Sequence, residues 1–218
     1  QILVNPYPIF KRHFTIVDKE HKSQSIVGRF KDMIEFTDIM REYFLMYNGP
    51  ECGASAPDHA HFQACSKEES MQGSYYDHID LIDNDKVQIS YENFPYSFIR
   101  IQAKNKKTMS KTFHLIYDIL AANNNGKEPM MNILAWYGLE ITKEHFGKNY
   151  DDQFESVAEH PYNCIIFLRS KHRPDCYYAK GDEQILISPA IAEMNGIFPI
   201  VREEDMEKLT PEKVYDIY

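Results

Sequence analysis

The residues with the clearest chemical potential are two histidines and a glutamine at alternating positions, His59-x-His61-x-Gln63. If this stretch is a β-strand, alternate side chains share a face, so the two imidazoles and the amide form a row. The intervening residues are alanine and phenylalanine, which gives the opposite face an apolar surface to bury. A neutral imidazole can attack an activated phosphate and split one transfer into two easier steps. This requires one free ring nitrogen, while the other donates its proton to a fixed acceptor, usually a backbone carbonyl.

Residues that can bind a phosphate precede this stretch. Residues 48–50 and 53–57 are rich in glycine and proline, and turns of this kind can aim backbone N–H groups at an anion. The charge that develops during phosphoryl transfer also needs side-chain donors. The donors that we predict near His61 are Ser55, Asn48, Gln63, Lys19 and the backbone at Gly53. This set favours nucleotidyl transfer over serine hydrolysis, because the sequence contains no G-x-S-x-G motif.

The composition limits the classes of function. The chain has 218 residues, is 43% hydrophobic and 26% charged, and carries a net charge of −9 without a long run of Lys or Arg. This disfavours nucleic-acid binding, which needs a basic face, but a few local donors can still bind a small phosphorylated ligand. No segment approaches 18 apolar residues, so we expect no membrane span. The four cysteines show no C-x-x-C spacing and indicate reduced thiols in a cytoplasmic protein.

The patterns of apolar residues predict an α+β fold. We expect a largely antiparallel sheet with helices packed on it, residues 66–86 as a loop with short local structure and residues 104–107 as an exposed basic turn. One helix should begin at Ser23 or Ser25 and run through Gly28 to Met40, and another should begin at Ser110. The predicted strands are 13–18, 43–47, the histidine-containing strand, 87–91, 97–103, 131–137, 162–169 and 184–188. Short helices are predicted at 189–195, before Gly196, and from Thr210-Pro211 onward.

The predicted elements follow the same order twice. An extended segment, a strand, a basic turn, a helix and two strands occur after Asn5 and again after Asn93. We therefore expect one domain over residues 1–218, in which residues 1–86 carry the active-site strand. Residues 87–218 would form a degenerate copy and a tail, with Tyr162, Cys164 and Ile166 at the positions of the row. Because the sequence opens at Gln1 without an initiator methionine, we also expect a natural N-terminal segment to precede it.

A resemblance to a known family adds to this interpretation. The sequence His-Ala-His-Phe-Gln-Ala at residues 59–64, with Gly53-Ala-Ser55 before it, resembles the histidine-triad (HIT-like) superfamily. The similarity is to the branch with Gln in place of the third histidine, which includes galactose-1-phosphate uridylyltransferase, diadenosine tetraphosphate phosphorylase and GDP-L-galactose phosphorylase. Residues 13–24 resemble the corresponding strand and turn of the tetraphosphate phosphorylases.

The resemblance implies a HIT-like fold and a nucleotidyltransferase of the phosphorylase type. Its substrate would be a nucleoside diphosphate sugar or a dinucleoside polyphosphate, and phosphate or a sugar phosphate would be the acceptor. His61 would form a covalent nucleotidyl-histidine, Gln63 would hydrogen-bond the transferred phosphate, and Ser55 and Asn48 would contact its oxygens. The family is also compatible with a homodimer.

The role of His59 stays open between an orienting neighbour and a zinc ligand, and His21 resembles the position of another such ligand. The cysteine pair that would complete this zinc site would lie before Gln1, and magnesium could accompany a nucleotide substrate. Two other functions remain open. One is a zinc or iron enzyme that uses the H-x-H strand, although Glu68 is too far from His61 for the iron spacing. The other is a nucleotide-binding module without catalysis.

Overall fold

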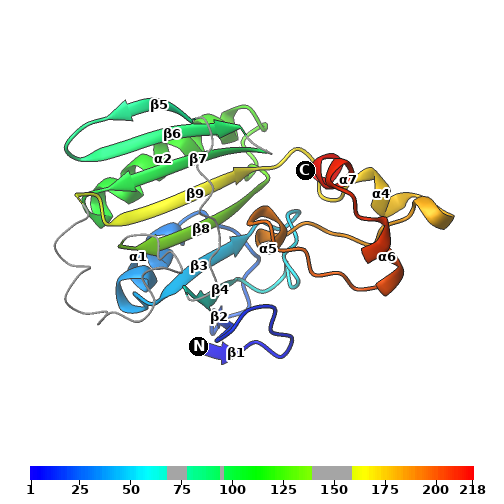
Figure 1. The fold of residues 1–218 in the computed structure, drawn as a ribbon. Helices are drawn as coiled ribbons and strands as arrows, with labels where there is room; N and C mark the ends of the chain where they lie inside the picture. Colours follow the sequence, from blue (N-terminus) through cyan, green and yellow to red (C-terminus); the bar gives the residue numbers. More distant parts are fainter. Residues whose placement is uncertain (68–77, 94–95, 139–158) are drawn as a thin grey trace, which may run out of the picture.

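The fold is built on one antiparallel sheet. The computed structural model describes residues 1–67, 78–93, 96–138 and 159–218. Within these ranges nine strands pair antiparallel in the order β1-β2-β4-β3-β8-β9-β7-β6-β5 (Figure 1). The strands are β1 (Ile2–Val4), β2 (Phe14–Val17), β3 (Tyr43–Asn48), β4 (His61–Ser66), β5 (His78–Asp83), β6 (Val87–Asn93), β7 (Ser97–Ala103), β8 (Met131–Tyr137) and β9 (Tyr162–Leu168).

The sheet consists of two halves with the same order of elements. The first contains β2, α1 (Phe30–Ile39), β3 and β4, and the second contains β7, α2 (Lys106–Ala122), β8 and β9. β3 pairs with β8 at the centre, and the halves continue outward with β4 then β2, and with β9 then β7. The predicted α+β architecture, an antiparallel sheet with helices packed on it in two related halves, is confirmed.

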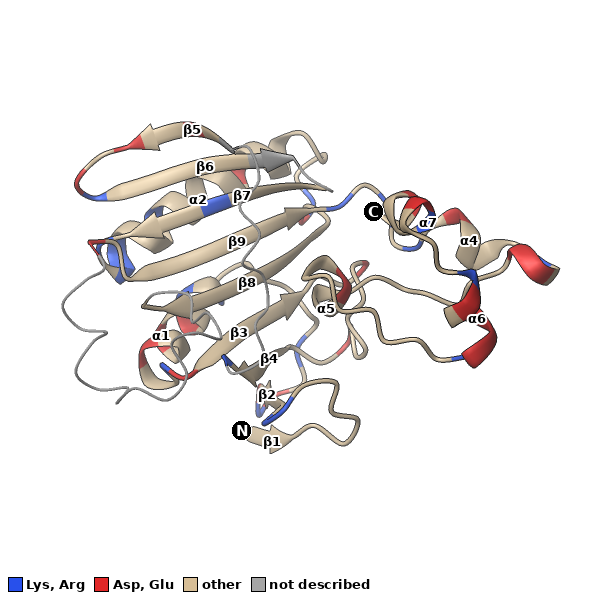
Figure 2. Cartoon of the chain, in the orientation of Figure 1, with Lys and Arg blue, Asp and Glu red and all other residues tan. Residues whose placement is uncertain are grey.

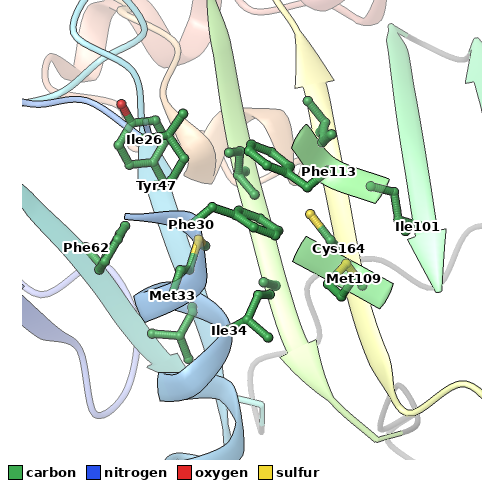
Figure 3. Packing of buried hydrophobic residues seen from close by; sticks show 14 of the residues in the cluster. Ile26, Phe30, Met33, Ile34, Tyr47, Phe62, Ile101, Met109, Phe113 and Cys164 are labelled. Carbon is green, nitrogen blue, oxygen red and sulfur yellow. The ribbon is translucent and has the colours of Figure 1, made fainter. Parts of the chain in front are cut away.

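The main core lies between the sheet and the two long helices (Figure 3). Phe30 of α1 stacks on Phe113 of α2 with ring centroids 3.6 Å apart and planes inclined by 5°. Both rings are buried, and Phe62 and Cys164 close the same core from the sheet. Since each helix comes from a different half, this contact joins the halves into one core. No helix in the described ranges is long and apolar enough to cross a membrane.

One short C-terminal helix packs on the opposite face of the sheet. α5 (Ile191–Met194) packs against β3 and β8, where it forms a second core with Phe44 and Trp136. The remaining C-terminal elements are α4 (Asp175–Tyr178), η2 (Gly181–Glu183), α6 (Glu203–Lys208) and α7 (Pro211–Ile217). Figure 2 shows Lys and Arg on several elements, interspersed with Asp and Glu. The side chain of Thr210 caps α7 and Gly196 follows α5 with φ +78°, as predicted, but α5 begins at Ile191 rather than at residue 189.

The strands differ from the prediction in two places. Residues 66–86 were expected to be a loop with short local structure, and we did not predict that β5 lies there and pairs with β6 at the edge of the sheet. The sequence of β5 combines apolar with acidic residues, and charged residues of this kind are common on exposed edge strands, so the segment was not recognised as a strand. Residues 184–188 do not form a strand. The N–H of Ile185 bonds the carbonyl of Cys176 and that of Leu186 bonds the Asp205 carboxylate, so loop and side-chain acceptors replace a neighbouring strand.

The predicted start of the second helix is also wrong. α2 begins at Lys106 rather than Ser110, and Asn105 is its cap, because its side-chain oxygen accepts the N–H of Thr108. The predicted basic turn at 104–107 therefore contains the first turn of the helix. Asparagine and serine are equally good caps, so two starts were compatible with the local sequence.

The first helix begins later than predicted. α1 starts at Phe30, and Gly28, which was expected inside the helix, has φ +74°. This left-handed conformation cannot continue a right-handed helix. Ser25 does not cap α1, and its hydroxyl instead donates to the Glu128 carboxylate.

The side chains of β9 differ by one residue from the predicted alignment with the row. Cys164 and Ile166 belong to the core on the helix face, as does Phe62, the neighbour of His61. Alternation therefore puts His61 on the opposite face, so Cys164 does not occupy the equivalent position. The side chains of β9 on the face of His61 are Asn163, Ile165 and Phe167.

A buried lysine directly follows β4 and leads to a prediction about stability. Lys67 is 3% exposed, its Nζ donates to the carbonyl of Tyr137, and burial lowers its pKa from 10.5 to about 7. The unfolded chain thus binds more protons between pH 7 and 10.5, so this group makes stability rise with pH in that window. Below pH 7 the buried lysine is protonated, and the full destabilisation from burying its charge is present. We expect Lys67→Met to raise the free energy of unfolding by about 2 kcal/mol at pH 6, and by less at pH 9.

Urea denaturation at the two pH values checks this effect. Lys106→Met is the control, because the Lys106 amine pairs with Glu35 and Asp38 and should not gain from losing its charge. A loss of stability in Lys67→Met at pH 6 would contradict the prediction.

Candidate active site

His61 is the first residue of β4, and its imidazole has one engaged nitrogen. Nδ1 lies 2.9 Å from the carbonyl oxygen of His59, which can only accept, so Nδ1 carries the ring proton. Nε2 has no hydrogen-bond partner among the described residues and keeps its lone pair. The residue is 4% exposed, and burial lowers its pKa below the ordinary value of 6.5. A neutral ring with one fixed and one free nitrogen is what nucleophilic attack requires.

Gln24 fixes the backbone around this imidazole. Its Oε1 accepts the N–H of His61 at 2.9 Å, and its Nε2 donates to the carbonyls of Asn48 and His61 at 2.9 and 3.0 Å. The regular pairing of β3 with β4 ends at Met46 and Gln63, and the Gln24 amide takes over where the ladder stops. No motif in the sequence marks Gln24, and we did not predict it.

Gln63 lies two residues after His61, on the same face of β4. Its Oε1 lies 2.9 Å from Nε2 of His13 and accepts a hydrogen bond from it. The amide NH₂ has no acceptor in the described part of the chain. Gln63 is therefore presented as a donor, which suits the oxygen of a phosphate.

Asn48 presents its amide in the same way. Its Oδ1 accepts hydrogen bonds from Nδ2 of Asn132 at 2.7 Å and from the N–H of Ile191 at 2.8 Å. Arg169 in turn donates to Oδ1 of Asn132 at 2.8 Å. With its oxygen occupied, Asn48 has only its NH₂ group to offer, and the second half of the chain sets this orientation. Asn132 and Arg169 were not predicted, because no local pattern links them to Asn48.

Two other predicted donors are not part of this network. Ser55 and Lys19 are exposed, and neither forms a hydrogen bond or ion pair with another described residue. The structure thus brings His61, Gln63 and Asn48 together. The roles of Ser55 and Lys19 stay predictions.

The loop before β4 packs on the C-terminal part through Gly53. This glycine has φ +86°, and a Cβ on it would lie 2.5 Å from Cβ of Ala190 and 3.1 Å from the carbonyl oxygen of Pro189. Arg169 donates to the same carbonyl at 2.9 Å. Gly53 is therefore needed for the turn and for a close contact, whatever its backbone N–H binds.

Gly53→Ala is expected to destabilise the protein by about 2 to 4 kcal/mol, because left-handed strain and steric overlap add up. Gly126→Ala separates the two terms, since Gly126 has φ +74° and a Cβ added to it would meet no other atom within 4 Å. It should lose only about 1 kcal/mol. Thermal unfolding of both variants measures the difference, and equal losses would rule out the close contact.

His59 precedes β4, so the predicted row of three side chains on one strand is wrong at this position. Its Nε2 donates to the carbonyl of Asp18 at 3.0 Å, and its Nδ1 lies 3.1 Å from Nδ1 of His21. The backbone N–H of Ala60 bonds Lys22, so the strand ladder starts only at the next residue. His59 orients His61 through its carbonyl oxygen rather than through its side chain.

His21 and His59, the two positions that the resemblance implies as zinc ligands, lie in contact with each other. A structural zinc ion takes four ligands. No group of three or more His, Cys, Asp or Glu side chains is placed to hold a metal in the described residues. Burial raises the pKa of the Cys52 thiol to about 11, which disfavours the thiolate that binds zinc. The role of His21 and His59 as zinc ligands stays a prediction, and Glu68 lies outside the described residues.

The sheet and the site together define a class of protein. It has an antiparallel α+β fold in which an imidazole on a strand lies beside two amide donors. The crystal structure of yeast Ap4A phosphorylase in complex with AMP has a similar fold, with a TM-score of 0.55 and 16% sequence identity over 99% of this chain and 71% of that chain. The chain therefore has the α+β fold of that phosphorylase, which is the HIT-like fold that we predicted, whereas membership of the superfamily and of its branch stays a prediction. The model of a domain of unknown function (DUF4922) matches residues 1–66. The search of curated proteins gave no match.

Proposed function

We propose that the chain is a nucleotidyltransferase of the phosphorylase type with His61 as its nucleophile. The observation that carries this proposal is the orientation of the imidazole, whose Nδ1 donates to the His59 carbonyl and leaves Nε2 free. The amides of Gln63 and Asn48, both with engaged oxygens, supply donors for the phosphate. The HIT-like fold and its likeness to an Ap4A phosphorylase bound to AMP support a nucleotide as substrate.

The reaction proceeds in two displacements. Nε2 of His61 attacks the α-phosphorus and a P–N bond forms. The leaving group, a sugar phosphate or a nucleoside polyphosphate, departs with the electron pair of the broken P–O bond. The proton on Nδ1 remains on the ring, and the His59 carbonyl stabilises the resulting imidazolium. An oxygen of the acceptor, phosphate or a sugar phosphate, then attacks phosphorus, and the P–N electron pair returns to Nε2.

The residue at the third position of the motif favours transfer over hydrolysis. A histidine there could protonate a leaving group or activate water, whereas the Gln63 amide has no proton to exchange in the neutral pH range. Gln63 can hold the phosphate while an acceptor replaces the leaving group. Nucleoside diphosphate sugars and dinucleoside polyphosphates both contain the required phosphoanhydride.

Intact-protein mass spectrometry tests the proposal. The wild-type protein is incubated with a panel of nucleoside diphosphate sugars and dinucleoside polyphosphates, without an acceptor. One of them should add a single nucleoside monophosphate to the protein, and phosphate or a sugar phosphate should remove it. A protein that binds nucleotides but gains no adduct and turns nothing over would be a binding module instead. Turnover that depends on a stoichiometric metal, without an adduct, would indicate a metal enzyme.

A further inference from the structure

His13 is a buried histidine whose position in the network suggests a role of its own. It directly precedes β2, and Thr15 of that strand pairs with Gln63 of β4. This pairing brings the His13 ring beside the Gln63 amide, with Nε2 and Oε1 2.9 Å apart. The residue is 3% exposed, and its ring packs edge-on against Phe10 at a centroid distance of 5.3 Å.

The hydrogen bonds of His13 fix its tautomer. The backbone N–H of Ile9 can only donate and lies 3.3 Å from Nδ1, so Nδ1 acts as an acceptor and the ring proton is on Nε2. That proton is then donated to Oε1 of Gln63. Nδ2 of Asn5 also lies near Nε2, at 3.4 Å, but the Gln63 oxygen is closer. Burial lowers the pKa of His13, which keeps the ring neutral and this assignment intact.

The tautomer decides how Gln63 faces the site. An amide can rotate by half a turn and exchange its oxygen and NH₂, and the flipped form would direct an oxygen at the anionic phosphate. The flipped form would also set the Gln63 NH₂ against the N–H of His13, so two donors would meet. His13 therefore excludes the orientation that would repel the phosphate.

We propose that His13 is a positioning residue that holds Gln63 as a hydrogen-bond donor toward the phosphate of the His61 intermediate. This inference rests on the proposed function, because it assigns His13 a part in the same transfer. His13 does not touch the reacting atoms and acts through Gln63. Partners that orient a reacting group in this way typically change a rate by about 10- to 100-fold.

A double-mutant cycle tests the coupling. His13→Phe keeps an aromatic ring but removes the donor, and it should slow formation of the nucleotidyl-protein by about 10-fold or more in single-turnover experiments. In a Gln63→Ala background the same change should slow it by less than about threefold, because the amide to be positioned is absent. Equal slowing in both backgrounds would indicate a merely structural role and overturn the proposal.

A conservative variant adds a second readout. The amide NH₂ of His13→Gln can reach the region of the lost Nε2–H, so this variant should be faster than His13→Phe. If the glutamine variant is as slow as the phenylalanine variant while both melt within about 2 °C of the wild type, the donor role is refuted. Packing alone would make the glutamine variant the slower of the two, since glutamine packs less well against Phe10 than an aromatic ring does. A faster glutamine variant would therefore reflect the restored donor.

Nuclear magnetic resonance keeps the test separate from the proposed function. Long-range ¹H–¹⁵N spectra of the wild-type protein should show His13 as a neutral ring protonated on Nε2, and Gln63→Ala should shift that nitrogen. A ring protonated on Nδ1, or no response to Gln63→Ala, would overturn the inference even if the enzyme is active. If no nucleotide leaves an adduct on the wild type, the proposed function fails, whereas these spectra still decide how His13 and Gln63 are paired.

Discussion

Replacing His61 by alanine should abolish the nucleotidyl-protein and lower turnover of the best substrate by about a thousandfold or more. The loss should be this large because no other imidazole of the site can take over. Both ring nitrogens of His13 are engaged, by Ile9 and Gln63, and those of His59 contact Asp18 and His21. Among the three described imidazoles of the site, only that of His61 combines a free Nε2 with a backbone acceptor for the proton on Nδ1. Adduct formation by mass spectrometry and steady-state turnover measure the two effects.

His114→Ala is the matched control. This histidine is exposed on α2 and makes a hydrogen bond to the Ser110 carbonyl, so its removal should leave both adduct formation and turnover within about twofold of the wild type. If His61→Ala still gains a nucleoside monophosphate, the nucleophile lies elsewhere. If both variants lose activity equally, the effect of His61→Ala is not specific to the site.

Side-chain alternation explains why part of the site could be predicted from the sequence. His61 and Gln63 are two residues apart on a strand, so their common face follows from the period of a strand alone. The need for a carbonyl beside Nδ1 follows from imidazole chemistry, and the structure provides it at His59. The strand itself begins later than expected, because its first paired residue depends on where β2 and the Gln24 side chain lie. A local pattern contains neither piece of information.

The residues that hold the two amides could not be predicted, because their contacts are made only in the folded chain. Asn132 lies 84 positions from Asn48 in the sequence, and Arg169 reaches Asn132 from the end of β9. Buried polar side chains of this kind provide hydrogen-bond partners for groups at the ends of strands. Neither the spacing of hydrophobic residues nor the composition of turns predicts which side chains do so.

The alignment of the two halves shows a related limit. Matching elements gave the correct order of elements along the chain, but the predicted equivalence of His61 with Cys164 is wrong, because the structure places these residues on opposite faces of the sheet. An error of one residue in an alignment moves every side chain of a strand to the other face. A repeat without sequence identity can therefore predict the order of elements but not which residues are equivalent. On the face of His61, β9 carries Asn163, whose side-chain NH₂ donates to the carbonyl two residues earlier, as His61 does.

Gln24→Leu should be the most destabilising substitution near the site. Leucine fills a similar volume but leaves three backbone groups without a partner, the carbonyls of Asn48 and His61 and the N–H of His61. The side chain is only 3% exposed, so water can replace these bonds poorly. Each unmet buried group costs about 1 to 3 kcal/mol, and partial relaxation of the loop leads us to expect a total near 3 to 4 kcal/mol. The midpoint of thermal unfolding should fall by about 10 °C.

Gln88→Leu provides the comparison, because the Gln88 amide makes one exposed bond to Asp83 and its loss should change stability by less than about 0.5 kcal/mol. Gln24→Glu is the second variant, for use if Gln24→Leu does not fold. It retains the acceptor for the His61 N–H but loses both donated hydrogen bonds, so its unfolding midpoint should lie between those of the wild type and the leucine variant. A midpoint for Gln24→Leu within about 2 °C of Gln88→Leu would show that the amide does not hold the ends of β3 and β4 together. In that case the direction of the His61 imidazole would depend on the His59 carbonyl alone, and variants of Gln24 that fold should form the nucleotidyl-protein at the wild-type rate.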